Sequence, residues 1–148
     1  MDDKTAFLEL STLLTGLRDD ILDDPVERAL NEPIAAEYAR RLRGTWGAKF
    51  AELLGAYKLL ADVLPKPPID DALLAALKAT PEFTANETVA RQIVTVWYFS
   101  QFNDDAGKLV DGGFFERGAV WPRIRAHPIG FSTQLHGYWA KQPAPFVD

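Results

Sequence analysis

The side chains best suited to catalysis in this sequence are two histidines, His127 and His136, nine positions apart. Both lie in a segment rich in proline and glycine, and no carboxylate separates them. Because zinc requires three or four ligands, two imidazoles alone make a poor metal site. We therefore interpret them as hydrogen-bonded surface or packing residues. Together with Tyr98 they remain the candidates for an alternative function, a small helical enzyme or ligand-binding domain with a pocket between helices.

Other combinations of catalytic residues are not found in the sequence. Ser11, Ser100 and Ser132 have no neighbouring base in the sequence, and the G-x-S-x-G pattern of a nucleophile elbow is absent. Asp104 and Asp105 are adjacent rather than opposed across a cleft, so they make a weak acid–base pair. Neither a G-x-G-x-x-G nor a Walker sequence is present. The sequence therefore predicts no catalytic residues, no bound cofactor and no metal in this chain.

Charge and composition narrow the possible partners. The net charge of −5 disfavours nucleic acid, whose phosphates require a basic surface, and anionic membranes. The sequence contains no cysteine, which excludes disulfides and thiolate metal sites. No run of about 18 apolar residues is found, so we expect no membrane span. The first residues lack the basic and apolar regions of an export signal, so the chain is expected in the cytoplasm if Met1 is its native start.

The strongest structural signal is an apolar segment at about residues 84–102. Its buried positions recur at helical spacing, and from Ile93 to Phe99 almost every side chain is apolar. This pattern predicts a central helix surrounded by others. Thr84 and Glu87 have the spacing of a capping box at its start. The predicted core consists of Phe7, Leu10, Leu14, Ile93, Val96, Trp97 and Tyr98.

Further helices are expected on both sides of this segment. A first helix covers about residues 5–15 and ends at Gly16. Residues 18–32 are predominantly acidic and are expected to form a solvated, partly mobile connection, in which Asp24 and Pro25 can begin a short helix. Later helices are predicted at about 33–43, ending at Gly44, at 46–64 and at 69–79, with an extended elbow at 65–68.

The last third of the sequence has a different character. Residues 103–148 contain large aromatic side chains spread among glycines and prolines, so we expect an irregular arm that packs on the helices or on a partner. The fold class is therefore all-α. We expect residues 1–148 to form a single-domain helical bundle, with a helical body at 1–102 and the arm at 103–148.

Short stretches distributed in order along the chain resemble a known family. The opening F-L-E-L-S at residues 7–11 with L-T-G at 14–16, E-P-I-A at 32–35, the W-Y pair at 97–98, F-E-R-G-A-V-W at 115–121 and G-Y-W-A at 137–140 carry the resemblance. They are similar to motifs in the small (gamma) subunit of bacterial membrane-associated FAD-dependent sugar and polyol dehydrogenases. That family includes small subunits of gluconate, sorbitol, fructose and glucose dehydrogenases.

The resemblance implies a noncatalytic subunit that binds the FAD-containing large subunit and supports its maturation and export. A cytochrome c subunit would be a further partner, and the flavin chemistry would take place in the large subunit. Relatives carry a twin-arginine export signal, which implies a periplasmic location, although this chain lacks the signal. On this view the partner interface lies in the arm, with aromatic anchors and two arginines between them: Trp121, Arg123, Arg125, Phe131, Tyr138 and Trp139. A cytoplasmic adaptor with unrelated partners is the remaining alternative.

Overall fold

The computed structural model describes residues 1–64, 70–111 and 118–120. The predicted elbow at 65–68 lies outside these ranges, as do residues 112–117 and 121–148 of the predicted arm. In chain order the elements are α1 (Asp3–Thr15), the π-helix η1 (Asp19–Asp23), α2 (Pro25–Val63), α3 (Asp70–Lys78), α4 (Pro81–Ala85), α5 (Glu87–Phe99), β1 (Phe102–Asn103) and β2 (Leu109–Asp111). The predicted all-α fold is confirmed, with the addition of a two-stranded sheet.

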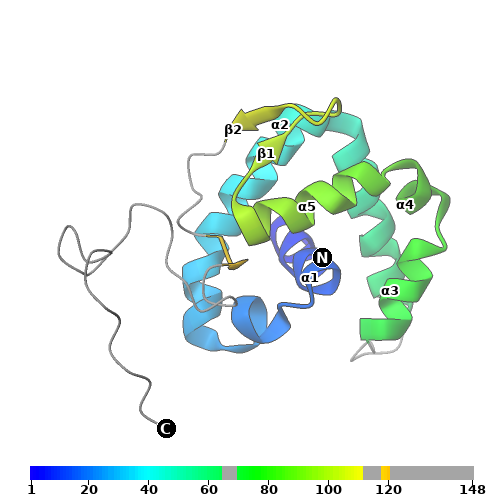
Figure 1. The fold of residues 1–148 in the computed structure, drawn as a ribbon. Coiled ribbons are helices and arrows are strands. Elements are labelled where there is room, and N and C mark those ends of the chain that lie inside the picture. Colours follow the sequence, from blue (N-terminus) through cyan, green and yellow to red (C-terminus); the bar gives the residue numbers. More distant parts are fainter. Residues whose placement is uncertain (65–69, 112–117, 121–148) are drawn as a thin grey trace, which may run out of the picture.

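The long helix α2 is the element around which the others are packed. It contacts α1, η1, α3, α4 and α5. Figure 1 shows it running along one side of the molecule, turning near the top and descending toward α3. The expected centre was the helix at 84–102. That segment does form the apolar helix α5, but the centre of the fold is α2, because only α2 is long enough to reach every other helix.

Gly47 allows α2 to change direction. Its backbone is non-helical, with φ 50° and ψ −118°, inside a helix of 39 residues. A positive φ is readily adopted only by glycine. The sequence predicted two helices separated at Gly44, but Gly44 is helical and the break falls three residues later. The first part also begins earlier than expected, at Pro25, because the Asp24 carboxylate accepts hydrogen bonds from the backbone N–H groups of residues 26 and 27.

The first helix follows the prediction closely. Asp2 caps its start by accepting a hydrogen bond from the Thr5 backbone N–H at 2.8 Å. Gly16 ends it in the left-handed conformation, with φ 71°. Phe7 and Leu10 are fully buried, and the Phe7 ring meets Phe50 of α2 edge to face, with ring centroids 5.7 Å apart. The burial of these large side chains supplies the main stabilisation of the α1–α2 contact.

Helix α5 buries the predicted residues Ile93, Val96 and Trp97 against α1 and α2. Leu14 and Tyr98, also predicted as core, are partly buried and pack against the cluster of buried core residues. The predicted capping box is wrong. Thr80 instead caps the short helix α4, so Thr84 is already helical and its hydroxyl donates to the Thr80 carbonyl oxygen at 3.3 Å.

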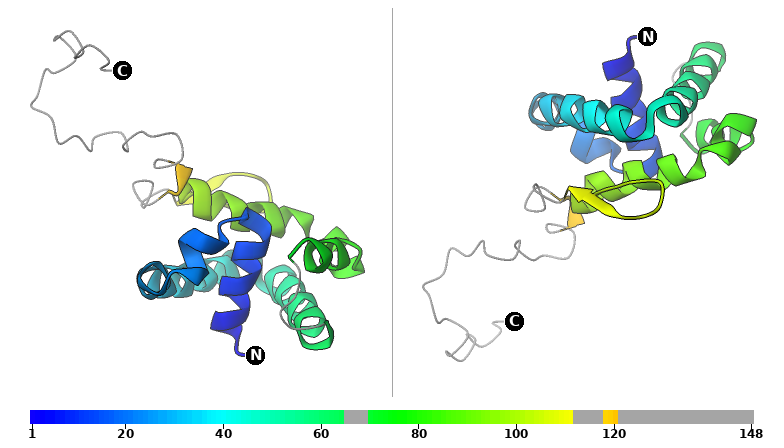
Figure 2. Two further views of the ribbon diagram at one scale, coloured as in Figure 1. Left: turned by 90° about the horizontal axis from the view of Figure 1, so that it is seen from below. Right: turned by 90° about the horizontal axis from the view of Figure 1, so that it is seen from above.

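A β-hairpin follows α5 where the sequence predicted the start of the irregular arm. Strand β1 pairs antiparallel with β2, and the two lie across α2 and α5 (Figures 1 and 2). The Asp104 carboxylate forms the turn by accepting hydrogen bonds from the backbone N–H groups of Ala106 and Lys108, at 3.0 and 2.9 Å. Such short strands leave no periodic signal, so the turn residues were the only feature that sequence reasoning could identify.

The break at Gly47 gives a test of the fold. Replacement by alanine forces an L-residue into a positive-φ conformation, and we expect a loss of about 1–3 kcal/mol in the free energy of unfolding. Gly44→Ala is the matched control, because Gly44 is helical and a Cβ there meets nothing within 4 Å. The control should stabilise by about 0.5–1 kcal/mol. Urea denaturation of both variants measures the difference, and equal effects would contradict the assigned break.

Candidate interaction surface

Polar side chains between the helices are engaged with one another and hold the body together. The Tyr57 hydroxyl of α2 donates a hydrogen bond to the Glu9 carboxylate of α1 at 2.9 Å. Burial and this carboxylate raise the pKa of Tyr57 well above its usual value, so the hydroxyl stays protonated. Arg18 binds Asp70 at the start of α3 through two hydrogen bonds of 2.7 and 2.8 Å. These groups join α1, α2 and α3, which is a structural role.

A buried polar contact fixes the end of α5. Ser100 is fully buried and adopts the left-handed conformation, with φ 52°. Its Oγ is hydrogen-bonded to the Tyr38 hydroxyl of α2 at 2.8 Å. The Tyr38 ring also meets Trp97 and Phe102 edge to face, at centroid distances of 5.3 and 5.4 Å. Ser100 has no neighbouring base in the sequence, and the structure places it in the core as a packing residue.

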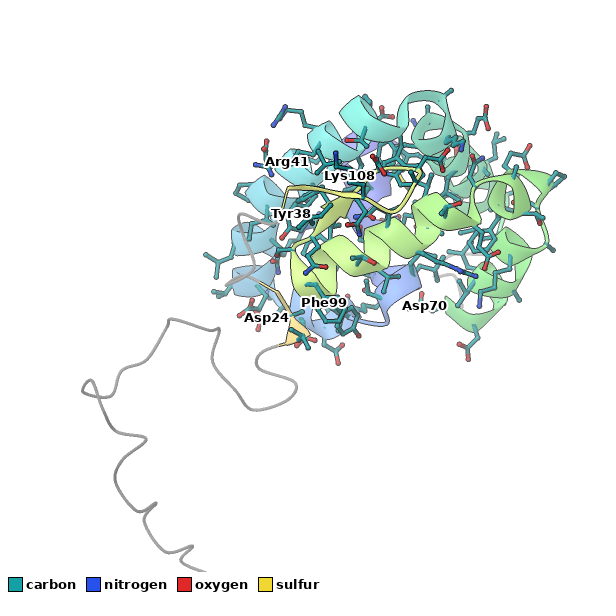
Figure 3. All side chains as sticks on the ribbon, turned by 45° about the horizontal axis from the view of Figure 1, so that its top comes forward. Asp24, Tyr38, Arg41, Asp70, Phe99 and Lys108 are labelled. Carbon is teal, nitrogen blue, oxygen red and sulfur yellow. The ribbon has the colours of Figure 1, made fainter. Side chains whose placement is uncertain are left out.

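An ion cluster lies on α2 beside the hairpin. Glu37 accepts hydrogen bonds from Arg40 and from Arg41, each as short as 2.7 Å. The two guanidinium groups lower the pKa of Glu37 to about 2. Arg41 also lies over the ring of Phe102, 5.1 Å from its centroid. The cluster therefore connects the surface of α2 to strand β1, as Figure 3 shows for Arg41 and Tyr38.

The hairpin is tied to α2 through its turn, and its second strand carries exposed apolar side chains. Lys49 of α2 forms a 2.5 Å salt bridge with Asp105 in the turn. Leu109 and Val110 of β2 are both more than half exposed. Adjacent residues of a strand point to opposite faces, so neither face of β2 is covered by the described part of the chain. An uncovered apolar strand of this kind is typical of a contact surface.

A second exposed apolar region lies where α2 begins. Val26 and Leu30 are one helical turn apart and are 67% and 60% exposed. They stand among carboxylates of η1 and of the first turns of α2. We call this region the acidic strip, and its exposed side chains are Asp19, Asp20, Asp23, Asp24, Val26, Glu27 and Leu30. The sequence predicted a solvated, partly mobile connection with a short helix here. The side chains are solvated, but the segment forms η1 and the first turns of the long helix α2, and the apolar pair on one helix face was missed.

The chain returns to the body just before the predicted interface. Gly118 is buried, and the Ala119 backbone N–H donates a hydrogen bond to the Trp97 carbonyl oxygen of α5 at 3.0 Å. This contact fixes residues 118–120 of the arm beside the last turn of α5, where Phe99 is 47% exposed. Figure 1 shows residues 118–120 at the same end of the molecule as η1 and the start of α2.

The six predicted interface residues, which run from Trp121 to Trp139, lie outside the described residues. His127 and His136 lie there too. Of the three residues of the alternative pocket, Tyr98 is the one that lies within the described residues. Its hydroxyl donates a hydrogen bond to the Thr15 carbonyl oxygen at 3.2 Å.

The Asn86-Glu87-Thr88 triplet has the pattern of a glycosylation acceptor. Asn86 is 2% exposed, and its amide donates to Glu52 and to the Glu82 backbone, so it is a packing residue.

The Tyr38–Ser100 contact can be tested by a double-mutant cycle. Tyr38→Phe and Ser100→Ala should each cost about 1–2 kcal/mol in the free energy of unfolding, because each leaves a buried oxygen without this partner. The double variant should lose less than the sum, with a coupling of about 0.5–1.5 kcal/mol. Tyr57→Phe combined with Ser100→Ala is the control and should be additive. An additive Tyr38–Ser100 cycle would show that the contact contributes nothing.

The Glu37 cluster predicts a pH dependence. The pKa of Glu37 is lowered from 4.5 to about 2, so its contribution to stability is present above pH 4.5 and is lost as the pH falls toward 2. The side-chain carboxyl signal followed by NMR should titrate with a midpoint near 2. Arg40→Gln should move this midpoint upward, whereas Arg91→Gln, which removes the separate pair with Glu87, should leave it unchanged. A midpoint that Arg40→Gln does not move would refute the assigned cause.

The described residues contain no group of three or more acidic, histidine or cysteine side chains that could hold a metal ion. None of the helices described is long and apolar enough to cross a membrane. No protein-family model, no curated protein and no solved structure matches the chain.

Proposed function

We propose that this chain is a noncatalytic small subunit of a flavin-dependent sugar or polyol dehydrogenase. It binds the FAD-containing large subunit and supports its maturation and export to the periplasm. Oxidation of the substrate takes place at the flavin of the large subunit. This proposal rests on the sequence resemblance for the identity of the partner, and on the surface of the helical body for the binding role.

The observation that supports the binding role is the distribution of exposed apolar side chains. Two polar pairs inside the body, Tyr57–Glu9 and Tyr38–Ser100, are engaged in helix packing. Large apolar side chains are exposed on β2 and at the end of α5, and others are exposed at the two ends of α2. A single exposed leucine requires no explanation, but the adjacent Leu109 and Val110 on one uncovered strand favour a contact surface.

The packing of the resembling motifs supports the same proposal. Phe7 and Leu10 of the opening motif are buried in α1, and Trp97 of the W-Y pair is buried in α5. These two helices are in contact, and the Tyr98 hydroxyl reaches back to the carbonyl oxygen of Thr15. The stretches that carry the resemblance in the body therefore form one packed unit, which can present the arm to a partner.

The test is co-expression of the chain with a candidate FAD-containing large subunit, the product of the gene next to its own. The chain alone should elute from size-exclusion chromatography without absorbance in the flavin band, and with the flavoprotein it should join a yellow complex. The full-length variant Phe131→Ala/Tyr138→Ala/Trp139→Ala should lose at least about tenfold in affinity, because aromatic anchors dominate interface energies.

The matched control is Leu59→Ala, which removes an exposed apolar side chain on the far part of α2 and should leave the complex intact. Recovery of the same amount of complex with the triple variant would exclude the arm as the interface. A flavin or dehydrogenase activity in the isolated chain would overturn the noncatalytic role.

A further inference from the structure

The acidic strip is an apolar helix face surrounded by carboxylates. Residues 19–32 contain six acidic side chains and one arginine, Arg28, which is paired with Glu32. Val26 and Leu30 lie among these acidic residues and are exposed on successive turns of α2. The opposite part of α2 has a similar apolar pair, Leu59 and Val63, but there the flanking charges are balanced, with Lys58 and Asp62. The acidic strip thus suits a ligand that is both apolar and cationic.

The sequence beyond the described body has this character. Residues 121–148 contain three cations, Arg123, Arg125 and Lys141, and one acid, Asp148, so their net charge is +2. The whole chain has a net charge of −5, which leaves −7 on residues 1–120. The first five of these residues read W-P-R-I-R, with two arginines and two large apolar side chains. Their composition is complementary to the acidic strip.

The start of this segment also lies at the same end of the molecule as the acidic strip. Ala119 is held by the hydrogen bond to the Trp97 carbonyl oxygen, and Val120 is partly buried. In Figures 1 and 2 residues 118–120 lie at the same end as η1 and the start of α2, and Figure 3 shows Phe99 and Asp24 near that end. Five residues span at most about 17 Å, so the segment can reach only surface near this end.

We propose that residues 121–125 bind the acidic strip of the same chain. The arginines Arg123 and Arg125 pair with its carboxylates, and Trp121 and Ile124 cover Val26 and Leu30. Exposed ion pairs contribute only about 0.2–1 kcal/mol each. Covalent attachment nevertheless gives the segment an effective concentration of order millimolar at the strip. The contact is therefore reversible and weakened by salt, so that a partner can displace it.

This inference concerns the isolated chain and does not depend on the flavoprotein partner. Because the chain has no cysteine, a pair of introduced cysteines reports the contact without interference. In the full-length Leu30→Cys/Ile124→Cys variant, oxidised glutathione should form an intramolecular disulfide. The matched control is Leu59→Cys/Ile124→Cys, since Leu59 is as exposed as Leu30 but lies on the far part of α2. The first variant should cross-link at least about fivefold faster than the control.

Charge reversal tests the electrostatic part of the contact. Arg123→Glu in the Leu30→Cys/Ile124→Cys background should slow cross-linking about threefold, whereas Lys141→Glu, the same charge change farther along the chain, should have little effect. High salt should slow the reaction as well. Equal rates for the two cysteine pairs would overturn the proposal. Disulfide-linked dimers in place of the intramolecular product would assign the strip to a second copy, and would overturn it too.

Discussion

The change of direction at Gly47 is the constraint on which the rest of the fold depends. A straight helix of 39 residues would be about 58 Å long, whereas a domain of this size has a radius of gyration of about 15 Å. The two parts of α2 enclose a common core only because the helix turns. The first part provides Tyr38 for the end of α5, and the second provides Phe50 and Tyr57 for α1. Without the turn, α1 could not contact both parts.

Regular features with a local cause were predictable from the sequence. The caps at Asp2, Gly16 and Asp24 and the buried face of α5 each follow from a few neighbouring residues. Apart from the capping box at Thr84, which Thr80 displaces, the predictions that failed depended on distant parts of the chain. The choice of Gly47 rather than Gly44 as the break cannot be read locally, since both are glycines between helical segments. Ser100 likewise takes its role from Tyr38, which lies 62 positions earlier.

The surface was harder to predict than the core. Val26 and Leu30 are spaced by one helical turn, which is a visible signal, but the surrounding charge favoured a solvated connection. Their significance depends on the finding that this segment belongs to α2 and that residues 118–120 return to the same end of the body. The interface proposed in the arm rests on sequence alone, because its residues are outside the described part of the chain.

The anchoring of Ala119 on Trp97 has a mechanical consequence. A load applied to the arm by a large bound partner reaches the body at residues 118–120, and so passes into the C-terminal turn of α5. The Tyr38–Ser100 hydrogen bond and the aromatic rings around it hold that turn against α2, so the force acts on the packed interface between α5 and α2. The β-hairpin, whose strand β2 precedes residues 118–120 in the chain, bears the load only after the hydrogen bond of Ala119 to Trp97 has broken.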